Sequence, residues 1–204
     1  TNQATTQHKW KQKLTTLIGS TNTATFYNAW LANHVTQADI IQVKNWGFNS
    51  VRLPLHYEYF VNAGTPDVWN NQGFTILDSV ISWCAAAGVY AIIDLHAAPG
   101  GQSNNDISDY DNTKPSLWES DFNKSKTVAL WAQLADRYKD EPWIGGYDLI
   151  NETNWNLGTF DLRNLYVQIT NAIRAVDTNH ILFIEGNWFA NDFTGLTPPW
   201  DSNM

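Results

Sequence analysis

Residues 89–95 read Val-Tyr-Ala-Ile-Ile-Asp-Leu, a short and almost continuously apolar run without regular alternation of polar side chains. Such a run is typical of a strand that is covered on both faces, as in a parallel sheet. The sequence contains three more runs of this kind, at residues 50–54, 146–150 and 181–185. We therefore predict four buried strands.

Helical patterns lie between and before these strands. Thr36-Gln37-Ala38-Asp39 fits the capping box that opens a helix, and this helix is expected to end near Trp46-Gly47. Strands that alternate with helices indicate an α/β protein with a parallel sheet and right-handed crossovers. Three further stretches carry apolar side chains at helical spacing: residues 74–87, 124–138 and 160–176.

The first 35 residues differ from the rest, because no strand precedes their two helical patterns at residues 8–18 and 25–32. A chain of 204 residues is long enough for one domain with a sizeable core and too short for two ordinary domains. We therefore expect a single domain over residues 1–204, with residues 1–35 as a helical lead-in.

The charge and the cysteine content argue against several classes of protein. Twelve Lys and Arg stand against twenty Asp and Glu, a formal net charge of −8, which is the wrong balance for binding nucleic acid. No apolar run approaches the ~20 residues of a membrane span, so no membrane partner is expected. Cys84 is the single cysteine and the five histidines are scattered, so we expect no disulfide framework and no metal site.

Aromatic residues make up 14% of the chain and include eleven Trp. One interpretation is a large aromatic core. The other is a sugar-binding cleft, because flat apolar rings stack on the apolar faces of pyranose rings. Composition alone leaves both open.

Polar side chains stand at the ends of the predicted strands. Because the carboxyl ends of parallel strands meet at one rim, these side chains are expected to line a common cleft. They are Arg52 in the first strand, His96 after the second, Asn151 and Glu152 after the third, and Glu185 at the end of the fourth.

Three of these side chains also have a purely structural interpretation. A carboxylate such as Glu152 after a buried strand is costly unless it is paired or catalytic, but it can also cap the next helix. Arg52 can form a buried ion pair that fixes the sheet, or orient a catalytic carboxylate, and the two roles are compatible. His96 can be a satisfied core histidine, although the Gly-Gly loop after it favours the rim.

Three segments together resemble family 5 of the glycoside hydrolases. The resemblance runs from about residue 36 to residue 188, and it implies a (β/α)8 TIM barrel, retaining hydrolysis of β-glycosidic bonds and no need for a cofactor. The segments are residues 46–54 (WGFNSVRLP), 94–102 (DLHAAPGGQ) and 147–152 (YDLINE).

The resemblance also implies roles for single residues. By position, Glu152 is similar to the acid/base of the family, and Asn151 to the asparagine that bonds the 2-hydroxyl of the sugar. His96 is similar to the histidine that lines the −1 subsite. Arg52 is similar to the arginine that supports the nucleophile.

Further substrate contacts are expected around this set. The loop after His96 is most similar to that of exo-β-1,3-glucanase-like members, in which an aspartate near the position of Asp106 contacts the terminal sugar. Trp155 and Trp188 follow the third and fourth strands and are candidates for platforms on which sugar rings stack. A core or lid role is the alternative for both tryptophans.

The sequence also departs from the family. Thr153 stands where the family has the proline of Asn-Glu-Pro. The motifs of strands 1, 6, 7 and 8 are not matched, so the chain is expected to cover roughly strands 2 to 5 and the nucleophile to lie outside it. Glu185 is expected to support the site rather than to attack the sugar. By itself, the chain is expected to be inert and to need the remainder of the barrel.

The resulting hypothesis is a secreted, extracellular O-glycosyl hydrolase that cleaves a β-glucan or a related β-linked polysaccharide. One alternative is an inactive carbohydrate-binding or interaction module on the same fold. Another is a complete, small doubly wound domain, which would bind its ligand where the strand order reverses.

Overall fold

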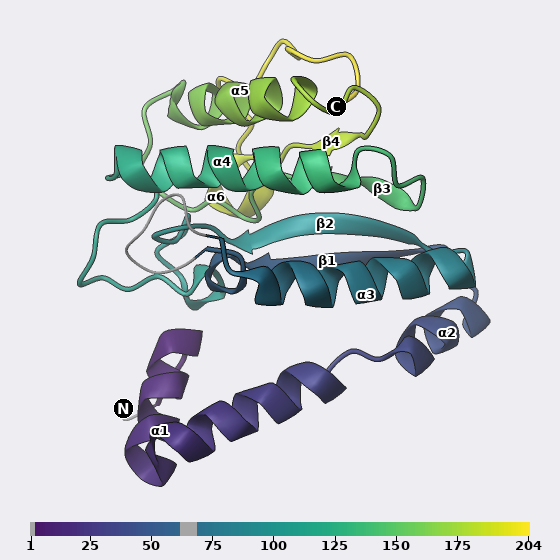
Figure 1. Cartoon of the computed structure of the whole chain (residues 1–204). Coiled ribbons are helices and arrows are strands. Elements are labelled where there is room, and N and C mark those ends of the chain that lie inside the picture. Colours follow the sequence, from purple (N-terminus) through teal and green to yellow (C-terminus); the bar gives the residue numbers. More distant parts are fainter. Residues whose placement is uncertain (1–2, 62–68) are drawn as a thin grey trace.

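The computed structural model describes residues 3–61 and 69–204 and shows an α/β fold built on one parallel sheet (Figure 1). The four strands lie side by side in sequence order, and every neighbouring pair is parallel. They are β1 (Ser50–His56), β2 (Tyr90–Ala97), β3 (Ile144–Asp148) and β4 (Leu182–Phe183). All four predicted strands are present, with ends shifted by a few residues.

The strand order separates two of the hypotheses from the sequence. A doubly wound domain has a point at which the strand order reverses. In the sheet formed by the described residues, the order runs from β1 to β4 without reversal, so the doubly wound hypothesis is wrong. Sequential parallel strands joined by helices are instead the repeating unit of a (β/α)8 barrel.

The connecting helices begin and end close to the predicted places. Thr36 and Asp39 form the predicted capping box, in which the Thr36 N–H donates to Asp39 Oδ2 over 2.8 Å. Gly88 ends one helix in the left-handed conformation, with φ of 67°, as a C-terminal glycine commonly does. The helices are α2 (Gln37–Asn45), α3 (Asn71–Ala87), α4 (Asp121–Tyr138) and α5 (Asp161–Arg174), with short helices η1 (Tyr57–Tyr59), η2 (Asp106–Ser108) and α6 (Asn187–Ala190).

The N-terminal helix α1 (Gln7–Asn33) is broken at Gly19, where φ is 80° and ψ is 161°. The two helices predicted at residues 8–18 and 25–32 therefore correspond to its two halves, and the second half begins earlier than predicted. The side chain of Asp109 binds the start of α1, because Oδ1 accepts from the His8 N–H over 2.9 Å. In the described part of the chain, no helix is both long and apolar enough to cross a membrane.

The core lies between the sheet and helices α3, α4 and α5. Trp131 is fully buried there and donates from Nε1 to the Leu149 carbonyl over 2.9 Å, which ties α4 to the segment after β3. Other tryptophans, such as Trp10, Trp46 and Trp188, are exposed. The aromatic content therefore serves both the core and the surface.

β1 and β4 are the two outer strands of the sheet. At the edge of β4, the Leu182 N–H donates to the Asn203 carbonyl over 2.9 Å, so the C-terminal residues run along this strand. Arg174 holds the same segment through a two-point ion pair with Asp201, with distances of 2.8 and 2.9 Å. This edge of the sheet is therefore partly covered.

Candidate active site

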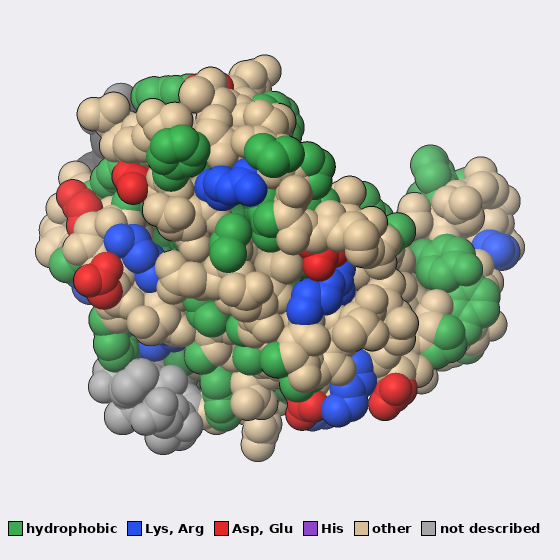
Figure 2. All heavy atoms as spheres, turned by 90° about the horizontal axis from the view of Figure 1, so that it is seen from above, with side chains coloured by type: hydrophobic (Ala, Val, Ile, Leu, Met, Phe, Trp, Pro, Cys, Tyr) green, Lys and Arg blue, Asp and Glu red, His purple; other side chains and the backbone are tan. Residues whose placement is uncertain are grey.

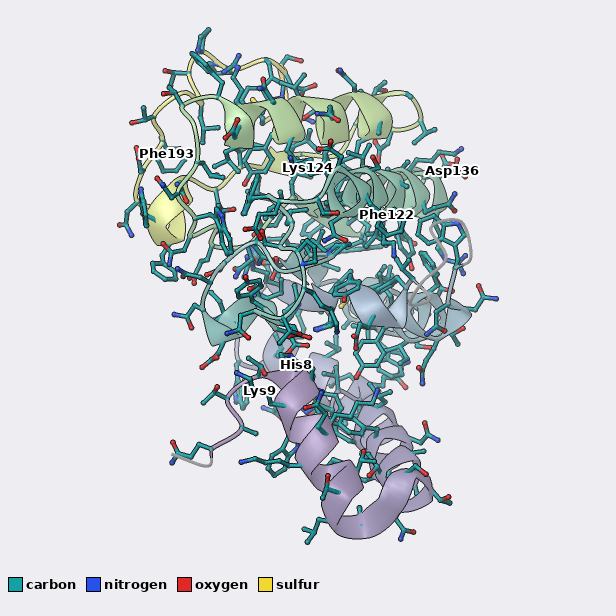
Figure 3. All side chains as sticks on the ribbon, turned by 90° about the vertical axis from the view of Figure 1, so that its left-hand side faces the viewer. His8, Lys9, Phe122, Lys124, Asp136 and Phe193 are labelled. Carbon is teal, nitrogen blue, oxygen red and sulfur yellow. The ribbon has the colours of Figure 1, made fainter. Side chains whose placement is uncertain are left out.

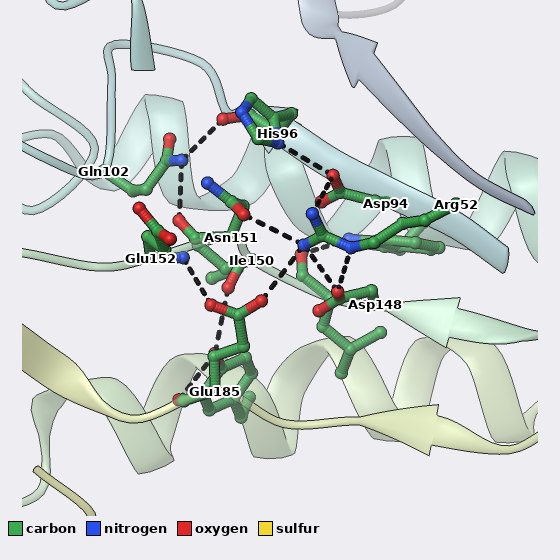
Figure 4. Close-up of polar contacts among 12 residues, drawn as sticks. Arg52, Asp94, His96, Gln102, Asp148, Ile150, Asn151, Glu152 and Glu185 are labelled. Atoms are coloured by element: carbon green, nitrogen blue, oxygen red, sulfur yellow. Dashed lines mark hydrogen bonds and ion pairs between the residues drawn. The ribbon is translucent and has the colours of Figure 1, made fainter. Parts of the chain in front are cut away.

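The polar residues after the strands meet at the C-terminal rim of the sheet (Figure 4). Arg52 comes from β1 and His96 from β2, whereas Asn151 and Glu152 follow β3 and Glu185 follows β4. Hydrogen bonds connect Arg52, Asn151, Glu152 and Glu185 directly. His96 is connected to Asn151 through Gln102, which donates to the main-chain carbonyls of both residues. The five residues therefore lie together as predicted, and their roles stay predictions.

Arg52 is the centre of the cluster. Its Nη1 lies 3.0 Å from Asp94 Oδ2, and its Nε donates to Asp148 Oδ2 over 2.8 Å. Its Nη2 donates to Asn151 Oδ1 over 2.9 Å and to Glu185 Oε1 over 3.0 Å. A planar guanidinium with five N–H donors suits such a junction, because it holds several acceptors at fixed angles. Arg52 thus forms the buried ion pairs of the structural interpretation. It also binds Asn151 and Glu185, as a residue that orients the groups of a site would.

His96 faces the rim rather than the core, since 35% of its side chain is exposed. Its Nδ1 lies 2.8 Å from Asp94 Oδ2, which fixes the ring orientation. Gln102 links the backbone at His96 to the backbone at Asn151. Its Nε2 donates to the main-chain carbonyls of His96 over 2.7 Å and of Asn151 over 2.8 Å. The loop after β2 is therefore anchored to the loop after β3.

Asn151 presents its amide with one end held and one end free. Its Oδ1 accepts from Arg52, whereas Nδ2 is buried without a hydrogen-bond partner among the described residues. A buried unpaired donor is costly, so such a group is commonly completed by a ligand or water. Asn151 is therefore prepared to donate a hydrogen bond into the cluster.

Glu152 adopts a left-handed backbone conformation, with φ of 39°. This conformation is uncommon for residues other than glycine, and strain of this kind is concentrated at functional sites. Its N–H donates to Glu185 Oε2 over 2.6 Å. The next long helix, α5, begins only at Asp161, so Glu152 does not cap it as the structural alternative required.

The remaining predicted substrate contacts lie outside this hydrogen-bonded cluster. Asp106 is exposed at the start of η2, and in the described residues its side chain has no hydrogen bond or ion pair with the cluster. Trp188 is 47% exposed and has φ of 52°. Their roles stay predictions.

Trp155 lines a hollow of about 490 Å³ between the first turns of α4 and α5. Lys124, which belongs to the wall formed by α4, is labelled in Figure 3. Asn187 fixes the Trp155 backbone, because its side chain accepts from the Trp155 N–H over 3.2 Å and donates to the carbonyl over 2.8 Å. Asp121 lies on the same α4 wall, Asn164 and Gln168 line the hollow from α5, and Trp118 lines it from the segment before α4.

Two carboxylates of the cluster were not singled out from the sequence. Asp94 and Asp148 interrupt apolar strands, and both side chains are buried, with 0% and 8% exposure. Burial, together with the nearby charge of Glu185, raises the pKa of Asp148 to about 7 against the opposing effect of Arg52. The signal was present, because a carboxylate within a buried strand needs the same explanation that was sought for Glu152.

Comparison with known proteins identifies the family. The sequence model for cellulase, glycosyl hydrolase family 5, matches residues 8–204. This chain belongs to glycosyl hydrolase family 5. The family match extends beyond the predicted resemblance at both ends and includes α1.

Relatives in family 5 span several named activities. A β-xylosidase of Phanerodontia chrysosporium is 37% identical over 181 residues, which are 89% of this chain and 38% of the relative. A probable glucan 1,3-β-glucosidase A of Aspergillus fumigatus is 29% identical over 88% of this chain and 43% of its own length. The chain therefore spans about two fifths of the curated relatives it matches.

A solved structure shows the same fold. The endoglucanase Cel5A of Thermotoga maritima superposes with a TM-score of 0.67 at 24% identity, over 83% of this chain and 51% of that chain. The parallel sheet of this chain is thus part of a (β/α)8 barrel, of which it forms roughly strands 2 to 5. The predicted fold class is confirmed.

Proposed function

We propose that this chain supplies the acid/base side of a retaining glycoside hydrolase that acts on a β-glucan or a related β-linked polysaccharide. The observation that carries the proposal is the Asn151-Glu152 pair at the rim, fixed from three sides by Arg52, Gln102 and Glu185. In this proposal, Glu152 protonates the leaving oxygen and later activates the water that releases the sugar.

Asn151 has the complementary role. Its free Nδ2 would donate to the 2-hydroxyl of the sugar at the −1 position, an interaction that strengthens in the transition state. Arg52 makes this donor available by holding Oδ1 of the same amide. His96, whose ring is oriented by Asp94, would line the same subsite.

The nucleophile is proposed to lie elsewhere in the full-length protein. A retaining mechanism needs a second carboxyl group about 5–5.5 Å from the acid/base. Both oxygens of Glu185 are already engaged, one by Arg52 and one by the Glu152 N–H. Glu185 is therefore proposed to position the acid/base rather than to attack the sugar.

The substrate class is supported by the relatives and by the charge of the chain. Solved family members were crystallised with cellobiose and mannotriose, and the curated relatives are named for glucosides, glucans or xylosides. The face over α5, seen from above, carries neutral polar and hydrophobic side chains, with acidic and basic side chains beside one another and no broad basic patch (Figure 2). The formal net charge of −8 suits a neutral carbohydrate better than a polyanion.

The test compares two substrates in the full-length enzyme with Glu152→Gln. We expect the variant to lose most activity on natural polysaccharide, about 100-fold or more, because the leaving alcohol needs a proton. Formation of the glycosyl-enzyme from an aryl glycoside with an acidic phenol should be largely spared. Equal loss on both substrates would overturn the assignment of Glu152 as the acid/base, and a full-length parent without activity on any β-glycoside would favour the non-catalytic binding module.

A further inference from the structure

Two buried aspartates lie side by side on the inner face of the sheet. Asp94 in β2 and Asp148 in β3 are register partners, so adjacent strands present both carboxyl groups at the same level. Like charges directly opposite each other on neighbouring strands are unfavourable. Both side chains are almost completely buried, which strengthens their repulsion.

The cluster contains more negative than positive charge. Arg52 is the cation that pairs with Asp94, Asp148 and Glu185, and no other Lys or Arg pairs with these carboxylates within residues 3–61 and 69–204. His96 from β2 also contacts Asp94, and Tyr166 from α5 donates to the Glu185 main-chain carbonyl over 3.0 Å. One proton on a carboxyl group would relieve this excess.

The three carboxyl groups differ in the donors that stabilise their negative charge. Asp94 receives the Arg52 guanidinium and the His96 ring, and Glu185 receives Arg52 and the Glu152 N–H. Asp148 is paired with Arg52 alone, through Oδ2. Its Oδ1 is buried without a partner in the described structure, as is Oδ1 of Asp94, so the two aspartates differ in the His96 contact that only Asp94 receives. A neutral acid is cheaper to bury in this arrangement than an anion with one bare oxygen.

Protonation of Asp148 matters because three side chains compete for hydrogen bonds from one nitrogen, Nη2 of Arg52. Arg52 Nη2 lies 2.6 Å from Asp148 Oδ2, 2.9 Å from Asn151 Oδ1 and 3.0 Å from Glu185 Oε1. This nitrogen carries two hydrogens for three acceptors. A full negative charge on Asp148 would draw one of these hydrogens away from Asn151 or Glu185, the two residues that present the amide donor and the acid/base.

We propose that Asp148 is a positioning residue that is held as a neutral carboxylic acid and thereby leaves Arg52 Nη2 to Asn151 and Glu185. The upward shift of the Asp148 pKa to about 7, caused first by burial and then by Glu185, agrees with this geometry. The positioning role of Asp148 rests on the proposed function. The protonation of Asp148 does not, because it is argued from the charges and hydrogen bonds of the cluster.

The direct test measures the proton without using activity. Infrared spectra of the full-length protein with Asp148 and with Asp148→Asn are subtracted between pH 5 and pH 9. We expect the difference to contain the carbonyl stretch of a protonated carboxyl group, which disappears with a midpoint near pH 7. Asp78→Asn is the matched control, because Asp78 is a half-exposed carboxylate paired with Arg137 on the outer helices. Absence of this band from the Asp148 difference spectrum at all pH values would overturn the proposal.

Kinetics then test the positioning role. Asp148→Asn mimics the neutral acid and should keep kcat within about threefold at pH 5.5 and lose less activity than the parent between pH 6 and pH 8. Asp148→Ala removes the acceptor for Arg52 and should lower kcat at least tenfold, with a smaller change in KM. Equal impairment of the two variants at every pH would contradict the role. If Asp148→Ala does not fold, the pH profile of Asp148→Asn decides. Because the infrared band is independent of catalysis, a failure of the Glu152 assignment would leave it in place.

Discussion

The N–H of Glu152 donates to Oε2 of Glu185 over 2.6 Å, so the proposed acid/base is held by a carboxylate from the next strand. The bond reaches a residue whose backbone is in the left-handed region, with φ of 39°. A charge-assisted hydrogen bond of this kind is stronger than a neutral one, and it can retain a conformation that the chain would otherwise avoid. The same carboxylate accepts from Arg52, which connects Glu152 to the rest of the cluster.

Glu185→Gln is predicted to lower kcat on polysaccharide about tenfold in the full-length enzyme, with a smaller effect on KM. An amide has one acceptor oxygen, so it can serve Arg52 or the Glu152 N–H but not both. Steady-state kinetics check this, with Glu141→Gln as the control because Glu141 precedes β3 and so lies at the opposite end of that strand from the cluster. Wild-type kinetics for Glu185→Gln would show that the hydrogen bond between the Glu152 N–H and Glu185 does not contribute to catalysis.

Asn151→Ala is predicted to lower kcat more than it raises KM. The removed amide would donate to the 2-hydroxyl mainly in the transition state, so its loss affects the chemical step. A pair of aryl glycosides with and without the 2-hydroxyl provides the measurement. The parent enzyme should prefer the hydroxylated substrate strongly, and the variant should lose most of that preference. An unchanged preference would remove this role from Asn151.

Trp155→Ala is predicted to raise KM for polysaccharide severalfold more than KM for a small aryl glycoside. The ring lines the hollow between α4 and α5, three residues after Glu152, where a longer chain would pass and a small substrate would not reach. Trp46→Ala is the matched control, since Trp46 is an exposed tryptophan that follows α2. A parallel rise in KM for both substrates would instead indicate a packing role for Trp155.

The raised pKa of Asp148 predicts how stability depends on pH. Its pKa is about 7 in the folded protein and near 3.8 in the unfolded chain, so the folded state binds more protons between these values. The contribution of Asp148 to stability is therefore greatest below pH 4, falls as pH rises towards 7 and is constant above it.

Urea unfolding of the parent and of Asp148→Asn at pH 5 and pH 8 measures this effect, because the contributions of other groups cancel in the comparison. The parent should lose on the order of 2 kcal/mol relative to the variant between the two pH values. A difference that does not change with pH would mean that Asp148 is ionised throughout.

The sequence predicted most of the sheet because its strands are short apolar runs whose pattern needs no tertiary information. The helices were predicted with similar success where local signals exist, such as the Thr36 capping box and the glycine at position 88. The ends of β3 and β4 were less accurate, because a strand ends where its neighbour stops pairing with it, and that depends on the next strand rather than on the run itself.

The site divides in the same way. Arg52, His96, Asn151 and Glu152 were found because strand ends and family motifs mark them. Gln102 was read only as part of a loop, and its ties to the carbonyls of His96 and Asn151 depend on how two loops pack. The competition for Arg52 Nη2 likewise involves side chains from neighbouring strands, so no local sequence pattern predicts it.

Trapping with azide shows whether Glu152 is the acid/base of a retaining enzyme. In the full-length Glu152→Gln variant, azide should restore turnover of an aryl β-glycoside, because a small anion can attack the glycosyl-enzyme without a general base. The product should be the β-glycosyl azide, since two inversions at the anomeric carbon retain its configuration. No rescue, or an α-glycosyl azide that places Glu152 as the nucleophile, would contradict the account.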